Sequence, residues 1–236
     1  MFEKPFNWIG RWAVKAYARL MFKMSILWHA PLPKGPKIIA ANHPSTTDPF
    51  LMTTLGSGPV SVLVHETLFK VPVFGQYLRR AGHIPVVPGN GRTALDRAQR
   101  LLNEGGTVVI FPEGDISPLE GGFLRPHTGV ARLSLSTGAP VIPIGIHLVR
   151  ERIHVIHTKV AGKSEVGTWY LRGPYAITIG KALHFEGNVE NRDLVRYITS
   201  SVMKRIAMLA QQSAYRMHQN MGEPPFRPDA VGFTQV

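Results

Sequence analysis

Short apolar runs alternate with stretches of helical periodicity along most of this 236-residue chain. Runs such as "TVVIF" are apolar at every position, which is typical of strands that are covered on both faces. Six runs of this kind predict strands at 37–41, 60–65, 83–87, 107–111, 140–146 and 174–180. Helical patterns predict helices at 49–55, 72–80, 92–103, 127–137 and 191–219. The pattern therefore predicts an α/β fold in which helices flank a sheet.

The N-terminal stretch 6–28 predicts one long helix or two short ones, with a cation at every fourth position. Four residues advance a helix by roughly 400°, so these cations form one slowly turning stripe. The cations are Arg11, Lys15, Arg19 and Lys23. Apolar and aromatic residues surround them, namely Trp8, Trp12, Tyr17, Leu20, Met24 and Trp28. This pattern is typical of a helix that lies in a membrane interface, and an ordinary surface helix is the alternative.

Proline and glycine divide the chain into three parts. "PLPKGP" at 31–36 predicts a break between a membrane-associating helical segment at 1–30 and a folded domain at 37–220. The Pro-rich stretch at 221–236 predicts an irregular tail. The length suits one α/β domain rather than two.

The formal net charge of +12 suits an anionic partner: nucleic acid, an anionic membrane surface, or a phosphorylated or CoA-like ligand. The chain contains no cysteine, which excludes disulfides, thiolate metal sites and a cysteine nucleophile. No apolar run reaches the roughly 18 residues of a spanning helix. Cations interrupt the N-terminal apolar region, so we expect no signal peptide.

Residues 41–50, "ANHPSTTDPF", carry a histidine and an aspartate five positions apart. In a helix the two side chains would lie about 140° apart, and Pro44 disfavours helical backbone for the residue before it. We therefore expect His43 at a strand end, and Asp48 with Pro49 as an N-cap and first helical residue. A loop of this length can bring the carboxylate to the imidazole and leave the other ring nitrogen to accept a proton. Alternatively, Asp48 is only a helix cap.

Glu113 and Gly114 follow the predicted strand 107–111, at the edge of the sheet where α/β proteins bind ligands. A carboxylate there can orient a hydroxyl-bearing acceptor, and glycine permits close backbone approach. Arg92, after a Gly-rich turn, and Arg125, before a predicted helix, are candidate ligands for an anion. For each of these sites an ordinary surface turn is the alternative.

Four blocks, in this order and spacing, resemble the glycerolipid acyltransferase family, whose best-known member is lysophosphatidate acyltransferase. They are "NHPSTTD" (42–48), "GHIPVVP" (82–88), "FPEGDIS" (111–117) and "APVIPIGI" (139–146). The joint match is far more specific than any single block. The resemblance covers about residues 37–147. It implies a mixed, mostly parallel sheet wrapped by helices, preceded by a membrane-docking helical start.

The resemblance also implies roles for single residues. His43 would be the general base that deprotonates an acceptor hydroxyl, and Asp48 would orient it. The hydroxyl would attack the thioester of acyl-CoA or acyl-carrier protein directly, with no acyl-enzyme and no further cofactor. Glu113 and Gly114 would belong to the acceptor site.

Two positions depart from the family pattern. Pro88 and Ile116 stand where the family has arginines that are expected to bind the phosphate of the acceptor. The resemblance therefore implies one of two arrangements. Either Arg92 or Arg125 replaces them, or the acceptor lacks a terminal phosphomonoester, as a lysophospholipid with a headgroup, a glycolipid or a lyso-aminolipid does.

These observations predict a peripheral membrane acyltransferase on the cytoplasmic face, acting on a lysophospholipid-like acceptor and contacting anionic lipids. No nucleic-acid motif accompanies the charge, so we expect no nucleic-acid partner. Two other interpretations remain open. One is a non-catalytic basic protein that binds membrane or nucleic acid, and the other is an acyl-thioesterase in which water replaces the hydroxyl.

Overall fold

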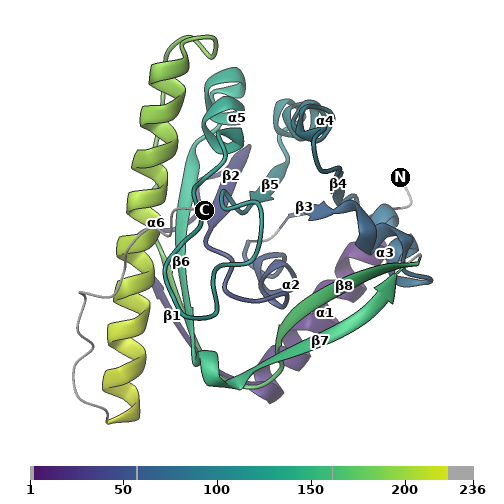
Figure 1. Cartoon of the computed structure of the whole chain (residues 1–236). Coiled ribbons are helices and arrows are strands. Elements are labelled where there is room, and N and C mark those ends of the chain that lie inside the picture. The colour runs from purple at the N-terminus through teal and green to yellow at the C-terminus, as the bar shows by residue number, and fades with distance from the viewer. Residues whose placement is uncertain (1–2, 57, 161, 223–236) are drawn as a thin grey trace.

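The computed structural model describes residues 3–56, 58–160 and 162–222, so nearly all of the predicted tail at 221–236 lies outside the described residues. Its strands are β1 (Phe22–Trp28), β2 (Lys37–Ala41), β3 (Val60–His65), β4 (Ile84–Val86), β5 (Thr107–Ile110), β6 (Val141–Leu148), β7 (Ile153–Val160), β8 (Lys163–Tyr170) and β9 (Gly173–Ile179). Its helices are α1 (Glu3–Met21), α2 (Asp48–Met52), α3 (Phe74–Arg80), α4 (Gly91–Asn103), α5 (Gly129–Thr137) and α6 (Arg192–Met221), with short 3₁₀ turns η1 (Glu66–Lys70) and η2 (Arg150–Arg152). Figure 1 shows their arrangement.

Seven strands form one sheet in the order β1-β9-β6-β2-β5-β3-β4, while β7 and β8 pair only with each other as a separate hairpin. Neighbours in the sheet are parallel except β6 and β9, which are antiparallel. The predicted α/β class with a mixed, mostly parallel sheet is confirmed. All six predicted strands and five predicted helices are present, with ends that differ by a few residues.

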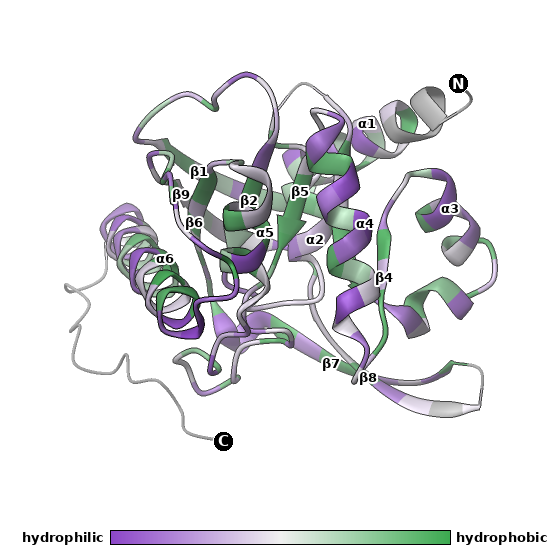
Figure 2. Cartoon of the chain, turned by 90° about the horizontal axis from the view of Figure 1, so that it is seen from above, coloured by the Kyte–Doolittle hydropathy of each residue, from purple (hydrophilic) through white to green (hydrophobic). Residues whose placement is uncertain are grey.

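The continuous apolar runs are explained by two cores, one on each face of the sheet. On β2, Ile38 and Ala40 belong to the core covered by α4, α5 and α6. Ile39 and Ala41 belong to the core covered by α1, α2 and α3. All four side chains are fully buried because successive residues of a strand point to opposite faces. Figure 2 shows helices on both sides of the sheet.

Helix α6 begins where the sequence predicts, since Asn191 accepts hydrogen bonds from the backbone N–H groups of Asp193 and Leu194. The helix runs along β6 and β9 (Figure 1). A Cβ on Gly145 would lie 2.0 Å from the backbone nitrogen of Ala210, so only glycine permits this close approach of helix and strand.

The prediction that residues 6–28 are helical is wrong for the last seven residues. Helix α1 ends at Met21, and β1 pairs in parallel with β9 at the edge of the sheet. In an edge strand, "FKMSILW" buries Phe22 while Lys23 remains exposed, and pairing with β9 overrides the helical spacing of the cations. The sheet therefore begins before the linker at 31–36, and Lys23 does not belong to the helical stripe.

Helix α1 exposes large apolar side chains, with Trp8, Trp12 and Leu20 at 70%, 64% and 80% of their maximum accessible surface. Within the described ranges, no helix combines the length and the apolar character needed to cross a bilayer. Helix α1 packs against α2 and α3 along one side, and its other side is exposed.

We predict that the protein loses stability between pH 6.5 and pH 4 because of two buried histidines. Burial lowers the pKa of His83 to about 4, and burial together with the charges of His218 and Arg150 lowers the pKa of His147 to about 4. Both rings are neutral when folded, whereas the unfolded chain binds their protons below about pH 6.5. The contribution of the two histidines to the free energy of unfolding is therefore fully present above that pH. It falls as the pH approaches 4, by about 2 kcal/mol per histidine between pH 7 and pH 5.

Urea denaturation of the wild type and of His83→Asn at the two pH values measures this effect. The imidazole of His83 accepts the N–H of Val62 at 3.2 Å, and an asparagine oxygen can replace that acceptor without titrating. The variant should lose about 2 kcal/mol less than the wild type between pH 7 and pH 5. Equal losses in both proteins would contradict the assignment.

Candidate active site

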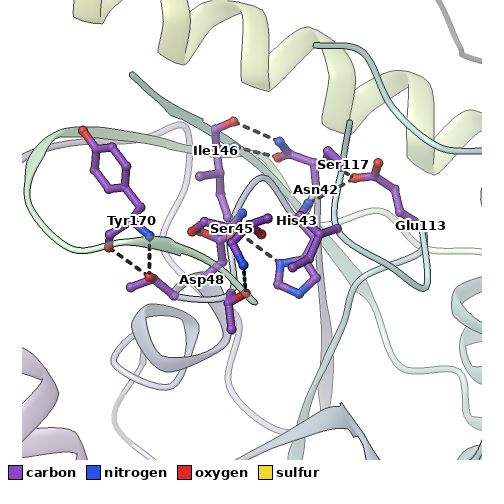
Figure 3. A network of polar contacts seen from close by, with 12 residues as sticks. Asn42, His43, Ser45, Asp48, Glu113, Ser117, Ile146 and Tyr170 are labelled. Carbon is purple, nitrogen blue, oxygen red and sulfur yellow. Dashed lines mark hydrogen bonds and ion pairs between the residues drawn. The ribbon is translucent and has the colours of Figure 1, made fainter. Parts of the chain in front are cut away.

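The carboxyl ends of three adjacent parallel strands, β5, β2 and β6, meet at one edge of the sheet. His43 follows β2 and Glu113 follows β5. Asn42 connects β2 to β6, because its side-chain amide donates to the carbonyl of Ile146 at 2.9 Å and accepts the N–H of Ile146 at 2.7 Å. This edge is where open α/β sheets bind ligands, and Figure 3 shows the polar network that occupies it.

His43 and Asp48 are in direct contact, with His43 Nδ1 3.1 Å from Asp48 Oδ2. The carboxylate is completely buried. Its Oδ2 also accepts the backbone N–H of Ser45 at 2.7 Å, and its Oδ1 accepts the hydroxyls of Ser45 at 2.8 Å and Tyr175 at 2.6 Å. Four donors therefore surround this carboxylate and compensate for its loss of water.

The contact determines the chemistry of the imidazole. A carboxylate acceptor at Nδ1 favours the tautomer with the proton on Nδ1, so that Nε2 carries the lone pair. The ring stacks on Phe111 with centroids 4.1 Å apart, and about 15% of the side chain is exposed. His43 is thus an oriented base at a partly open surface.

Asp48 is not the N-cap of the following helix, as the sequence predicted. The N-cap is Thr47, and Asp48 is the first residue of α2, ahead of Pro49. The carboxylate instead reaches back to the Ser45 N–H and to the His43 ring. The Asp48 carboxylate therefore binds the His43–Ser45 loop and Tyr175 rather than the first turn of α2.

Glu113 is buried, and its carboxylate accepts three hydrogen bonds from the protein. Oε1 accepts the backbone N–H of His43 at 3.0 Å and the hydroxyl of Ser117 at 2.8 Å, and Oε2 accepts the backbone N–H of Leu124 at 2.8 Å. Burial raises the pKa of Glu113, and these three hydrogen bonds oppose that effect. In this structure Glu113 fixes the backbone of the base, and its role as an acceptor ligand stays a prediction.

Gly114 adopts a φ of +74°, a left-handed conformation that favours glycine. A Cβ at this position would lie 2.6 Å from Cδ2 of His127. The close approach predicted here therefore involves the His127 ring, which lies directly over the turn after β5.

Arg92 and Arg125 are exposed, and within the described residues neither forms a hydrogen bond or ion pair with His43, Asp48 or Glu113. Arg92 lies in the first turn of α4, and Arg125 follows Leu124 in the loop before α5. The structure does not connect either arginine to the base.

The sequence interpretation missed Arg150, which lies in η2 two residues after β6. Its guanidinium donates to the carbonyls of Pro118 and Leu119, in the loop that follows Glu113. Burial lowers the pKa of Arg150, and the charges of Glu113 and Asp48 nearby oppose this. A cation just past the carboxyl end of a strand beside β2 is the signal that would have identified it.

Most of the predicted membrane-contact residues lie at the surface, but Arg11 is an exception. The exposed ones are Trp8, Trp12, Lys15, Arg19 and Lys23. The guanidinium of Arg11 donates to the carbonyls of Gly56 and Gly58, and burial lowers its pKa. Arg11 therefore holds α1 to the loop after α2.

Comparison with known proteins identifies the family. The family model described as "Acyltransferase" matches residues 25–147, which is more than half of the chain and includes His43, Asp48 and Glu113. A similar solved structure is that of the 1-acyl-sn-glycerophosphate (LPA) acyltransferase PlsC from Thermotoga maritima, with 22% sequence identity and a TM-score of 0.57. The match covers 86% of this chain and 79% of that one, and it supports the fold. No curated protein matches the chain. The chain belongs to the acyltransferase family, as its four sequence blocks predict.

Proposed function

We propose that this protein transfers a fatty acyl chain from an acyl thioester to a hydroxyl of a lysophospholipid-like acceptor. The observation that carries the proposal is the contact of His43 Nδ1 with the buried carboxylate of Asp48, which leaves Nε2 as a base. It lies inside the segment that the family model matches.

The proposed reaction is one direct transfer between the two substrates. Nε2 of His43 takes the proton of the acceptor hydroxyl as the oxygen attacks the thioester carbonyl carbon. The C–O bond forms, the C–S bond breaks, and the leaving thiolate receives the proton from the imidazolium. Asp48 stabilises the imidazolium while it exists. The chain has no cysteine, in keeping with direct transfer rather than a cysteine acyl-enzyme.

Acyl-CoA and acyl-carrier protein are the proposed donors, and we propose no further cofactor. Both donors are acidic, and the net charge of +12 favours their encounter with this protein.

The proposed acceptor is a lysophospholipid, and its headgroup is the point at which this chain differs from the family. The solved PlsC structure is that of a 1-acyl-sn-glycerophosphate acyltransferase. Here Pro88 and Ile116 replace the two expected arginines, and Arg92 and Arg125 are exposed at the surface. Arg150, whose guanidinium donates to the loop that follows Glu113, is a further cation near Glu113 and Asp48. These positions favour an acceptor whose phosphate carries a headgroup.

We further propose that the protein is a peripheral membrane protein on the cytoplasmic face. The exposed Trp8 and Trp12 of α1, with Lys15 and Arg19, supply the apolar and basic surface that binds an anionic interface.

Replacing the base should abolish transfer. We expect His43→Ala to lower the rate by about 10²–10⁴-fold, since general-base catalysis contributes this much. Incubation of purified protein with radiolabelled acyl-CoA and a panel of lysolipids, followed by separation of the products, measures the effect. Exposed His184→Ala, outside α1 and the β7–β8 hairpin, is the matched control, and wild-type turnover by His43→Ala would refute the assignment.

The same assay distinguishes a thioesterase. Transfer requires that product lipid forms and that thioester cleavage rises when lysolipid is added. Cleavage to free fatty acid at the same rate with and without lysolipid would identify water as the acceptor.

Asp48→Asn should lower the rate strongly. The neutral amide no longer stabilises the imidazolium of His43, and an amide N–H at the place of Oδ2 would face the backbone N–H of Ser45. We expect a loss of about 10²–10⁴-fold in kcat with unchanged helix content by circular dichroism. If Asp48→Asn has wild-type activity, the carboxylate has a structural role only.

Glu113→Gln tests whether this residue positions the base or binds the acceptor. The amide group cannot accept from both the His43 and Leu124 N–H groups, so one buried donor loses its partner at a cost of about 1–3 kcal/mol. A positioning role predicts a lower thermal midpoint and a lower kcat with little change in KM. A rise in KM for the lysolipid alone, with unchanged stability, would instead establish acceptor binding.

A further inference from the structure

The β7–β8 hairpin is a two-stranded unit outside the main sheet, and the sequence pattern did not predict it. It exposes Val155, Ile156 and Val166 at 44%, 41% and 53% of their maximum. Adjacent residues of a strand point to opposite faces, so Val155 and Ile156 place apolar surface on both sides of the hairpin. An exposed two-stranded hairpin with apolar side chains is a surface that suits a partner.

The charge of this segment indicates the kind of partner. The hairpin contains Lys159, Lys163 and two histidines against Glu165, and Glu151, Arg152 and Arg172 lie next to it. Exposed apolar residues among cations are the combination that binds the interface of an anionic bilayer.

The outer end of the hairpin lies on the same side of the molecule as α3 and the N-terminal end of α1, opposite α6 (Figures 1 and 2). On that side Val73, the N-cap of α3, is 81% exposed and has a φ of +61°. A β-branched residue in this conformation is strained by about 1–3 kcal/mol, and its apolar side chain lies in solvent.

A series of ring contacts joins these elements. Tyr77 of α3, against which Gly10 of α1 packs, stacks on Phe74, with centroids 6.2 Å apart. Phe74 lies 5.8 Å from Phe50 of α2, which stacks on Trp169 of β8 at 6.2 Å. The hairpin and α1 are therefore parts of one packed surface.

Strand β8 is also bonded to the loop that carries the base. Thr46 donates its N–H to the carbonyl of Thr168 at 2.7 Å and accepts the Thr168 N–H at 3.0 Å through its hydroxyl. The Thr47 hydroxyl donates to the carbonyl of Tyr170 at 2.9 Å and accepts the Tyr170 N–H at 3.1 Å. Figure 3 shows the contacts at Tyr170. The position of the hairpin thus determines the position of the loop between His43 and Asp48.

We propose that the β7–β8 hairpin is a second membrane-binding element, which lies in the interface of an anionic bilayer and holds the His43–Asp48 loop at its surface. Together with α1 it orients the site toward acceptors that reside in the bilayer. The functional role of this membrane binding rests on the proposed acyl transfer to a membrane lipid. Membrane binding itself is measured without substrates.

Cosedimentation with vesicles tests the inference. The full chain, without acyl donor, is incubated with phosphatidylcholine vesicles that contain or lack phosphatidylglycerol. The double variant Val155→Asp/Ile156→Asp should bind the anionic vesicles at least about tenfold more weakly than the wild type, because apolar burial and favourable charge are both lost. The control is Tyr197→Asp/Met208→Asp on α6, which makes the same charge change at exposed residues on the opposite side. It should remain within about twofold of the wild type.

A milder pair of variants applies if the aspartates disturb folding, as judged by circular dichroism. Lys159→Gln on β7 should weaken binding to anionic vesicles about fivefold, since a lysine near the surface contributes about a factor of this size. Lys204→Gln on α6, also exposed, is the control and should change the affinity less.

Three outcomes would overturn the inference. They are equal vesicle binding by hairpin variants and wild type, equal losses in the hairpin and α6 variants, and loss only of self-association or of binding to acyl-carrier protein.

A second experiment compares the rate of acyl transfer to vesicle-borne lysolipid with the rate for a short-chain monomeric lysolipid. The hairpin variants should lower the first rate relative to the second. Absence of transfer by the wild type would refute the proposed function and leave the cosedimentation result intact.

Discussion

The buried carboxylate of Asp48 is the interaction on which the candidate site depends. A charge removed from water requires compensation, and here the compensation comes from Ser45, Tyr175 and the ring of His43. Because these donors come from the loop itself and from β9, the carboxylate shapes the loop and orients the base at the same time. Loss of any one donor therefore affects both stability and chemistry.

Two further buried polar side chains, those of Asn42 and Glu113, hold the loop at its other end. Asn42 fixes the end of β2 to β6, and Glu113 fixes the backbone of His43 to the turn after β5. The base is consequently attached to both neighbouring strands of the central sheet. In this arrangement two residues of the family's motifs contact other parts of the protein. Glu113 accepts hydrogen bonds from them, and Gly114, which has no side chain, leaves room for the ring of His127.

The sequence was sufficient to predict a helix or strand where its local pattern agrees with its burial in the fold. Strands such as β2 and β5 are apolar on both faces, and the capping of α6 by Asn191 is a local interaction, so both were predictable. Edge strand β1 and the β7–β8 hairpin were not. In β1 the alternation of Phe22, Met24 and Ile26 coincides with a helical spacing of cations, and β7 is exposed along most of its length. Contacts between residues far apart in the sequence could not be predicted either. His43 and Asp48 were found through a local motif, whereas Tyr175 and Arg150 reach the site only through the tertiary fold.

The hydrogen bonds of the site also span very different distances along the chain. His43 pairs with Glu113 over 70 positions, Asn42 with Ile146 over 104, and Asp48 with Tyr175 over 127. Closing loops of this length has an entropic cost that the contacts must offset. The family segment at 25–147 ends before Tyr175, so it contains His43 and Asp48 without the complete set of donors to the carboxylate. During synthesis, the segment that carries His43 and Asp48 therefore acquires its full set of donors only after β9 has joined the sheet.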